Sequence, residues 1–306
     1  MESATTTRGA PLVGGQSRVL SVVRDYLILT KPRIISLLLV TTVATMIAAN
    51  PDGLAISTVL WTMLGGYLAA GGAGAINHYI DRDRDARMAR TSGRPIVAGR
   101  IAPAHGLIFG ITLGVLAAIQ LSVTVNPLAA ALAIGGLLGY VVIYTLWLKP
   151  LTPQNIVIGG AAGAMPPLVG WAAATGGLAP EALFPFVTVF LWTPPHFWAL
   201  ALLIKDDYAR TGIPMMPVAR GDESTRRQIL AYAVVLVAFT ILPVAAGFLG
   251  PIYLAGAVVL GAAFIVLAAR LLRSPTRPLA LRLYLFSLLY LALLFAMMAA
   301  DRLLLA

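Results

Sequence analysis

Long apolar segments alternate with short polar ones along this chain. Each apolar segment is about 20 residues long, the length that a helix needs to cross a bilayer. Their apolar positions are continuous rather than alternating, which argues against the strands of a membrane β-barrel. The pattern therefore predicts an all-α polytopic membrane protein. Its nine predicted spans are 26–49, 55–77, 104–123, 127–147, 155–175, 181–203, 228–249, 251–272 and 282–300.

The composition supports a membrane protein and excludes several kinds of chemistry. Of the 306 residues, 59% are hydrophobic and 11% are charged, whereas soluble proteins carry about 25% charged residues. The sequence has no cysteine, which rules out disulfides, a thiolate nucleophile and cysteine-ligated metals. The net charge of +10 is compatible with a nucleic-acid partner. Because the basic residues lie between the spans, however, membrane topology explains them better, and we expect no nucleic-acid partner.

The basic residues segregate to one side of the predicted bundle. With nine spans, 21 of the 22 Lys and Arg residues fall on one face, and only Arg302 falls on the other. The positive-inside rule makes the rich face cytoplasmic. We therefore expect a cytoplasmic N-terminal segment at 1–25, one transmembrane domain at 26–303 and a C-terminus outside. The N-terminal residues show no Arg-rich amphipathic presequence, which favours a bacterial inner membrane.

An acidic motif follows the second predicted span. In a continuous helix Asn77, Asp81 and Asp85 lie at i, i+4 and i+8, on one face, while Asp83 points elsewhere. Two carboxylates and an amide oxygen are hard ligands that suit Mg²⁺ bridged to phosphate oxygens. Like charges one turn apart also repel each other, so a cation would stabilise them. The stripe predicts a metal site at the cytoplasmic mouth.

Basic residues and a second acidic helix end accompany this motif. Two of the downstream arginines, Arg90 and Arg94, carry guanidinium groups suited to phosphate. The sixth predicted span ends in Asp206 and Asp207, four spans after the first acidic end. Local ion pairs in a solvated loop are the alternative explanation for such charges. The regular spacing and the recurrence favour a Mg²⁺-diphosphate site in the two long polar connections, 78–103 and 204–227.

The sequence resembles the UbiA superfamily of intramembrane prenyltransferases. Members carry an Asn-x₃-Asp-x₃-Asp motif after the second of nine helices and a second acidic motif after the sixth. Within the superfamily, the closest resemblance is to the members that farnesylate heme B. The residues that carry it are Asn77–Asp81, Asp85, Met88–Thr91, Arg94–Pro95, Thr152–Gly160, Pro166–Pro167, Gly170–Trp171, Thr193–Trp198, Lys205–Tyr208 and Gly212–Met215.

The resemblance implies a UbiA-type bundle around a central cavity and a Mg²⁺-dependent reaction. In that reaction the farnesyl group of farnesyl diphosphate is joined to a vinyl group of heme B, giving heme O, a substrate for a downstream heme A synthase. Asn77, Asp81 and Asp85 would bind the metal, and Asp206 and Asp207 would extend the site. Many members have two spaced Asp residues here, whereas these are adjacent. Whether this end binds a second metal ion is therefore open, and Lys205 and Tyr208 are candidates to contact the diphosphate directly.

Three polar residues within or at the ends of the predicted spans have two interpretations. His78 and His196 lie within matching motifs, so each is a candidate to contact the heme iron or a propionate. A lone histidine in an apolar setting is more often a hydrogen-bonded core residue. Asn155 is a candidate to orient a polar substrate group, although polar residues at span ends also hold helices together.

Two other functions compete with heme farnesylation. One is a related transferase with an aromatic acceptor such as 4-hydroxybenzoate, which the His196 and Thr152–Gly160 segments disfavour. The other is a transporter of an anionic lipophile. Transporters place ionisable residues near the bilayer midplane, whereas here these residues cluster at one interface.

Overall fold

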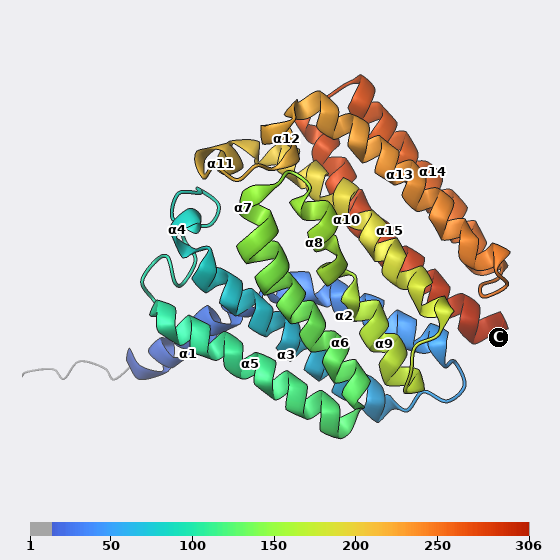
Figure 1. The fold of residues 1–306 in the computed structure, drawn as a ribbon, viewed down its shortest axis with the longest axis horizontal. Coiled ribbons are helices and arrows are strands. Elements are labelled where there is room, and N and C mark those ends of the chain that lie inside the picture. Colours follow the sequence, from blue (N-terminus) through green and yellow to red (C-terminus); the bar gives the residue numbers. More distant parts are fainter. Residues whose placement is uncertain (1–13, 306) are drawn as a thin grey trace, which may run out of the picture.

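The structure is a computed structural model that describes residues 14–305, with side chains from residue 19 onward. This part of the chain is helical and contains no strand (Figure 1). Its α-helices are α1 (Gly14–Thr30), α2 (Pro32–Ala49), α3 (Ile56–Ile80), α4 (Arg82–Asp85), α5 (Pro103–Thr124), α6 (Pro127–Leu138), α7 (Lys149–Leu151), α8 (Asn155–Gly163), α9 (Met165–Thr175), α10 (Leu183–Leu203), α11 (Lys205–Arg210), α12 (Met216–Ala219), α13 (Gly221–Ala245), α14 (Pro251–Arg273) and α15 (Arg277–Leu305). A π-helix, Gly139–Leu148, joins α6 to α7, and a 3₁₀ turn, Pro180–Ala182, precedes α10.

Nine helical segments in the described region are long and apolar enough to cross a membrane. The predicted number of spans is therefore confirmed, but the boundaries of several spans differ from the prediction. The seventh span is Gly221–Ala245 rather than 228–249, because polar residues of the predicted loop form its first turns. The second span continues to Ile80 instead of ending at 77. Of the predicted cytoplasmic segment 1–25, residues 1–13 lie outside the described region.

The first predicted span is in fact two helices. Lys31 has φ 58° and ψ 53°, a left-handed conformation that separates α1 from α2. Pro32 explains the break, because a proline disfavours the α-helical conformation for the residue before it. A left-handed conformation at a non-glycine residue is strained and is often found at functional sites.

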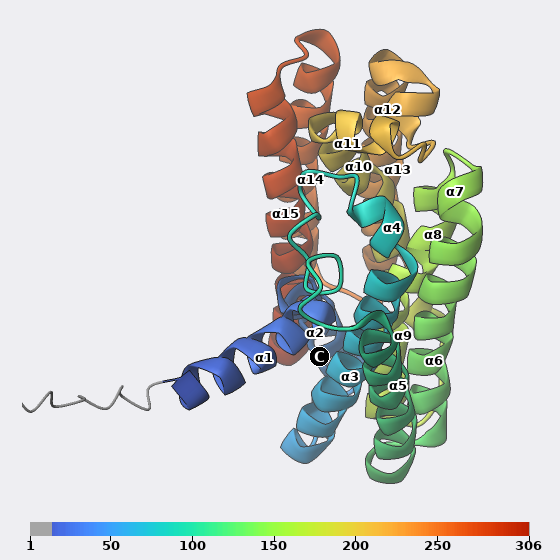
Figure 2. The same cartoon turned by 90° about the vertical axis from the view of Figure 1, so that its left-hand side faces the viewer.

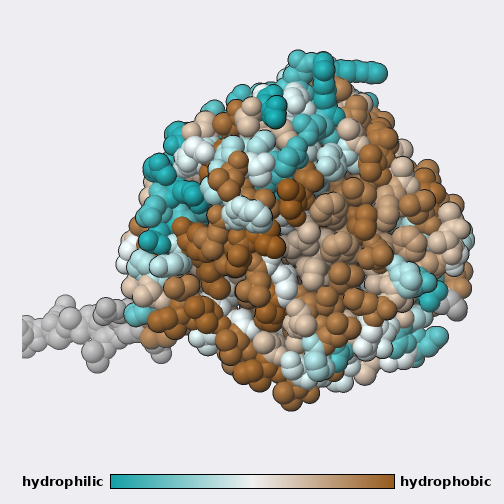
Figure 3. Space-filling model, in the orientation of Figure 1, coloured by the Kyte–Doolittle hydropathy of each residue, from teal (hydrophilic) through white to brown (hydrophobic). Residues whose placement is uncertain are grey.

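The short helices gather at one end of the bundle. Figure 1 shows α4, α7, α11 and α12 together at the upper left, and the C-terminus at the opposite end. In Figure 2, α1 projects sideways from the bundle beside α3 and α5. Hydrophilic residues follow the upper and left rim of the molecule, and hydrophobic ones dominate the surface between the ends (Figure 3). The polar end corresponds to the face that the charge count predicted to be cytoplasmic.

Close packing fixes α3 against α5. A Cβ atom on Gly72 would lie 2.7 Å from the carbonyl oxygen of Gly110, and one on Gly110 would lie 2.9 Å from that of Gly72. Only glycine allows the two backbones this approach, as at other small-residue contacts between membrane helices. The contact holds the helix that carries Asn77 in a defined position.

At the end of the bundle opposite the short helices, a carboxylate on α15 accepts hydrogen bonds from the start of α14. Asp301 is 2% exposed and accepts hydrogen bonds from the backbone N–H groups of Gly250, Ile252 and Tyr253 at 2.5, 3.0 and 3.1 Å. These N–H groups form the first turn of α14, where a negative charge is stabilising. Next to it, the Nε of Arg302 donates to the carbonyl oxygen of Ala48, at the end of α2, at 3.2 Å.

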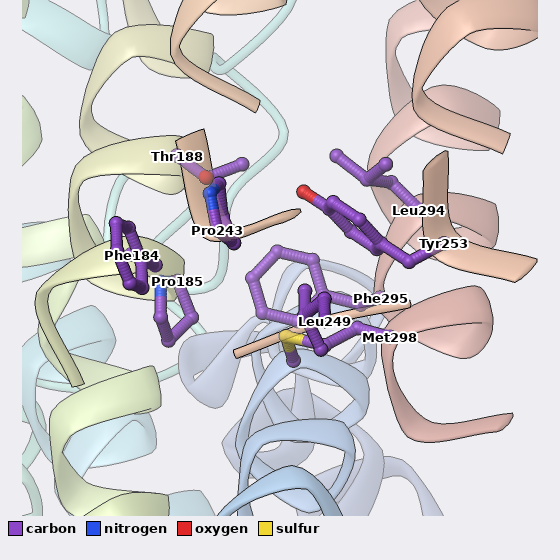
Figure 4. Close-up of a pocket in the computed structure, with 9 residues that line it drawn as sticks. All are labelled: Phe184, Pro185, Thr188, Pro243, Leu249, Tyr253, Leu294, Phe295 and Met298. Atoms are coloured by element: carbon purple, nitrogen blue, oxygen red, sulfur yellow. The ribbon is translucent and has the colours of Figure 1, made fainter. Parts of the chain in front are cut away.

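A small apolar pocket lies in the same half of the molecule as Asp301 (Figure 4). Helices α10, α13, α14 and α15 and the loop before α14 line it with Phe184, Pro185, Thr188, Pro243, Leu249, Tyr253, Leu294, Phe295 and Met298. It lies near the start of α10, whereas the acidic residues follow the end of that helix. The central cavity implied by the resemblance therefore remains a prediction.

Candidate active site

The acidic stripe lies where α3 meets α4. The N–H of Asp81 donates to the carbonyl of Asn77 at 2.9 Å, and the N–H of Asp85 donates to that of Asp81 at 2.8 Å, so the helical register continues across the junction. Asn77, Asp81 and Asp85 are 4%, 1% and 4% exposed. The side chain of Asp83, by contrast, is 83% exposed. The spacing thus places three buried oxygen-bearing side chains on one face, as the sequence predicted.

Four cations surround these oxygens. Lys149 forms an ion pair with Asp81, and Arg94 forms one with Asp85. Arg84 reaches Asp81 at 3.3 Å. The Nζ of Lys31 donates to the amide oxygen of Asn77 at 2.7 Å, and the Nδ2 of Asn77 donates to Asp81 at 2.7 Å. Lys31, Asn77, Asp81, Arg84 and Lys149 form one connected network at the polar end of the bundle, and the pair of Asp85 and Arg94 lies one helical turn further on.

The network shifts the pKa values of its members. Burial, together with the positive charges of Arg94 and Lys149, lowers the pKa of Lys31 to about 7 although the nearby carboxylates oppose the change. Burial by itself would raise the pKa of Asp81, but the charge and hydrogen bond of Lys149 outweigh it and hold this pKa below its usual range. Asp81 is therefore an anion at neutral pH.

Lys31 and Lys149 were not predicted as site residues. In the sequence they counted only as topology charges at the ends of spans. Each directly precedes a proline, Pro32 and Pro150; Lys31 lies at the break between α1 and α2, and Lys149 lies where the π-helix passes into α7. A lysine followed by proline at the polar end of an apolar segment is a weak signal that could have identified them.

The π-helix forms one wall of the site. The hydroxyl of Tyr140 lies 3.5 Å from the Nζ of Lys31, and the Oγ1 of Thr145 accepts from the Nδ2 of Asn77 at 3.3 Å. The rings of Tyr140 and Tyr144 stack at 5.5 Å. The π-helical register brings these side chains and Lys149 to the stripe; π-helical turns are often found at functional sites.

The second acidic end contributes less than the sequence predicted. Asp206 is exposed, and only Asp207 is buried, with the Nη2 of Arg210 3.6 Å from its carboxylate. Adjacent residues of a helix point about 100° apart, so the two carboxylates do not face the same site. Lys205 pairs with Asp222 at 2.9 Å rather than with the acidic stripe. The structure thus gives Asp206 and Lys205 no contact with the acidic stripe, and their roles in the site stay predictions.

Tyr208 connects this end to the first motif. It is 8% exposed and packs with Met88, which follows the acidic stripe. Burial raises its pKa, and the nearby guanidinium groups of Arg90 and Arg94 oppose that rise. The phenol of Tyr208 is therefore protonated at neutral pH, and its hydroxyl can donate a hydrogen bond close to the two arginines.

The three buried polar residues lie in different surroundings. Asn155 is fully buried and donates to the carbonyl of Lys149 at 3.4 Å, while its Oδ1 has no partner in the described region. His78 is 3% exposed, and its Nδ1 likewise lacks a partner among these residues. His196 faces α15, where its Nδ1 lies 2.7 Å from the Oγ of Ser287. Asn155 thus adjoins the acidic network, whereas His196 belongs to a separate cluster.

The donor set fits a Mg²⁺ ion only in part. Within residues 14–305, no group of three or more His, Cys, Asp or Glu side chains is arranged to hold a metal. Asp81, Asp85 and the amide oxygen of Asn77 supply fewer oxygens than the six that Mg²⁺ takes. Because Mg²⁺ keeps waters and binds phosphate oxygens, this set fits an ion that a diphosphate completes.

Comparison with known proteins identifies the family. The UbiA prenyltransferase family matches residues 38–297. The protoheme IX farnesyltransferase of Roseiflexus sp. (strain RS-1) is 55% identical over 283 residues, which are 92% of this chain and 53% of that protein. The enzyme of the same name from Symbiobacterium thermophilum is 52% identical over 284 residues, 92% of this chain and 94% of that protein. The chain spans about half the length of several curated relatives that it matches.

Solved structures show the same fold at low sequence identity. A digeranylgeranylglyceryl phosphate synthase superposes with a TM-score of 0.76 at 18% identity, covering 92% of this chain and 99% of that one. A UbiA homolog from Archaeoglobus fulgidus bound to DMAPP and Mg²⁺ has a TM-score of 0.62 at 16% identity, covering 90% and 99%. Sequence and fold agree, and the chain belongs to the UbiA prenyltransferase family.

Proposed function

We propose that this protein transfers the farnesyl group of farnesyl diphosphate to a vinyl group of heme B, with Mg²⁺ as cofactor, to give heme O. The names of the curated relatives support the donor and the acceptor. The related fold that binds DMAPP and Mg²⁺ supports the use of a prenyl diphosphate with a metal. The observation that carries the proposal is the buried stripe of Asn77, Asp81 and Asp85 surrounded by cations.

In this mechanism the stripe and the cations have different roles. Asn77, Asp81 and Asp85 would hold Mg²⁺, with Asp207 as the candidate ligand from the second acidic end. When bound, the metal neutralises part of the diphosphate charge. Lys31, Lys149, Arg90, Arg94 and Tyr208 would bind the remaining phosphate oxygens, and Asn155 and His78 would contact the polar edge of a substrate.

Charge stabilisation of the leaving group is the catalytic contribution of these residues. As the bond between farnesyl C1 and oxygen breaks, negative charge develops on the diphosphate, and preorganised cations in a poorly hydrated site stabilise it. The electron pair of the heme vinyl group then forms the new bond to C1. Water adds to the other vinyl carbon and releases a proton, which gives the hydroxyethylfarnesyl group and free diphosphate.

The orientation follows from the charge distribution. We place the acidic stripe at the cytoplasmic face of a bacterial inner membrane, with the N-terminus inside and the C-terminus outside. Farnesyl diphosphate then enters from the cytoplasm, the prenyl chain and heme lie among membrane lipids, and heme O is available to a heme A synthase. A reporter fused after the last residue is expected to report an external location; a cytoplasmic signal contradicts this orientation.

The test compares three aspartates of one motif. Membranes carrying Asp81→Asn or Asp85→Asn are supplied with farnesyl diphosphate, heme B and Mg²⁺, and heme O is quantified by mass spectrometry. Loss of one charged group at such a site is expected to reduce the rate about 100- to 1000-fold. Asp83→Asn removes the same charge from an exposed position and should retain wild-type activity.

Two controls define the outcome. Chelation of Mg²⁺ should abolish the reaction, and its restoration should recover it. Parallel assays with 4-hydroxybenzoate in place of heme B test an aromatic acceptor. Full activity of both buried-aspartate variants would refute the metal-diphosphate role, and prenylation of 4-hydroxybenzoate but not of heme B would refute the acceptor.

A further inference from the structure

His196 is held by aromatic rings and by one hydrogen bond. It is the fourteenth residue of α10, about 10 Å along the helix from the end that leads to Asp207. The ring of Trp192 stacks on the imidazole at 4.2 Å with an interplanar angle of 18°, and that of Tyr284 stacks at 4.9 Å and 27°. The imidazole is 7% exposed and cannot change its orientation without displacing these rings.

The contacts of Ser287 determine which nitrogen of His196 carries the proton. The hydroxyl of Ser287 donates to the carbonyl oxygen of Tyr284 at 2.6 Å. Since its one hydrogen is committed there, its oxygen accepts from the Nδ1 of His196, 2.7 Å away. The Nε1 of Trp192 donates to the carbonyl of Ser287 at 2.7 Å and fixes the serine backbone. His196 is then a neutral imidazole protonated at Nδ1.

This arrangement leaves Nε2 with an unshared electron pair. Among the described residues, the only hydrogen bond recorded for the His196 ring is the one at Nδ1, and none is recorded at Nε2. A histidine that only joined α10 to α15 would require the Nδ1 contact alone. Nε2 is absent from the fully buried polar atoms without a partner in the described region, so this nitrogen is open to a ligand rather than enclosed by protein.

We propose that Ser287 is a positioning residue that holds His196 as the Nδ1–H tautomer and so presents Nε2 to the iron of the porphyrin acceptor. Histidines that bind metals through one nitrogen usually donate the other N–H to an oxygen, which fixes both the tautomer and the ring orientation. Neutral imidazole is also an established axial ligand of heme iron. The inference rests on heme B being the acceptor of the proposed reaction.

The test uses two porphyrins that differ only in the metal. The full-length protein in detergent is titrated with ferric protoporphyrin IX and, separately, with metal-free protoporphyrin IX, and the absorption spectra are recorded. His196→Gln is expected to lose the absorption of histidine-ligated iron, whereas its affinity for the metal-free porphyrin stays at the wild-type value. Added imidazole should restore the iron spectrum in His196→Gly.

Serine and threonine variants test the positioning role. Ser287→Ala should weaken binding of ferric protoporphyrin IX about 10- to 100-fold, as is typical when the partner of a metal-bound histidine is removed, without affecting the metal-free porphyrin. Ser287→Thr, which keeps the hydroxyl, should restore binding. Thr62→Val is the matched control, because it removes a buried hydroxyl that bonds only to its own helix in α3.

Two results would overturn the inference. One is an unchanged iron spectrum and affinity in His196→Gln and Ser287→Ala, and the other is an equal loss of both porphyrins, which would indicate a purely structural role. If the wild type makes heme O while either result is obtained, the inference fails and the proposed function stands. A wild-type protein that neither binds ferric protoporphyrin IX nor makes heme O overturns both.

Discussion

Removal of the carboxylate of Asp301 is expected to destabilise the end of the bundle that lies opposite the acidic stripe. Its three hydrogen bonds connect α15 to the first turn of α14. The hydrogen bonds of a charged group contribute about 1.5–3 kcal/mol each, but the three do not add fully. The amides of Gly250 and Ile252 are only half-buried, so water can replace their partner, whereas the amide of Tyr253 is buried. For Asp301→Ala this gives a loss of about 3 kcal/mol in the free energy of unfolding.

Asp301→Asn should cost less, about 1–2 kcal/mol, because the amide oxygen still accepts but no longer carries the charge that favours a helix N-terminus. Thermal unfolding in detergent, followed by the fluorescence of the five tryptophans, measures both variants. At about 2–4 °C per kcal/mol, the alanine variant should melt about 6–12 °C below the wild type. Asp52→Asn, an exposed carboxylate expected on the same side, is the control. An alanine variant that melts with the wild type would refute the capping role.

Two further predictions concern the position and charge of the site. Lys149→Met removes the cation paired with Asp81 and should lower kcat/KM for farnesyl diphosphate about 100-fold or more. Lys149→Arg, which keeps the charge, should have an intermediate kcat/KM. A change of less than about threefold in Lys149→Met would exclude Lys149 from the reaction. Gly72→Ala places a methyl group against the backbone of Gly110. This should lower the free energy of unfolding by about 1–3 kcal/mol, and with it the melting temperature and the activity. Gly163→Ala, with open space around it, should reduce neither, and equal behaviour of the two variants would contradict the packing argument.

The spans were predictable from sequence because bilayer thickness sets a minimum length for an apolar helix. The interruptions of the α-helix within these spans could not be predicted from the sequence. A uniformly apolar segment such as Gly139–Leu148 has no polar face whose period would reveal a π-helical register. The break at Lys31 was indicated by Pro32, yet a proline is also compatible with the first turn of a continuing helix.

The acidic stripe was predictable because its geometry is local, with successive members four positions apart in the sequence. Its partners come from distant positions: Lys31 lies 46 residues from Asn77, and Lys149 lies 68 residues from Asp81. Such contacts depend on how helices pack, and a single sequence does not encode this in any periodic pattern. For Asp206 and Asp207, helical geometry alone already excluded a shared direction.

The π-helix makes the site sensitive to chain length as well as to residue identity. Its register carries Tyr140, Thr145 and Lys149 to the same wall. Deleting one residue within Gly139–Leu148 would remove the extra residue that a π-helical turn accommodates, and the directions of Tyr140, Thr145 and Lys149 relative to one another would change. Lys149 would then turn from Asp81 toward a neighbouring helix or lipid, although every side chain of the site was still present in the sequence. Across this segment, point substitutions are therefore easier to accommodate than single-residue insertions or deletions.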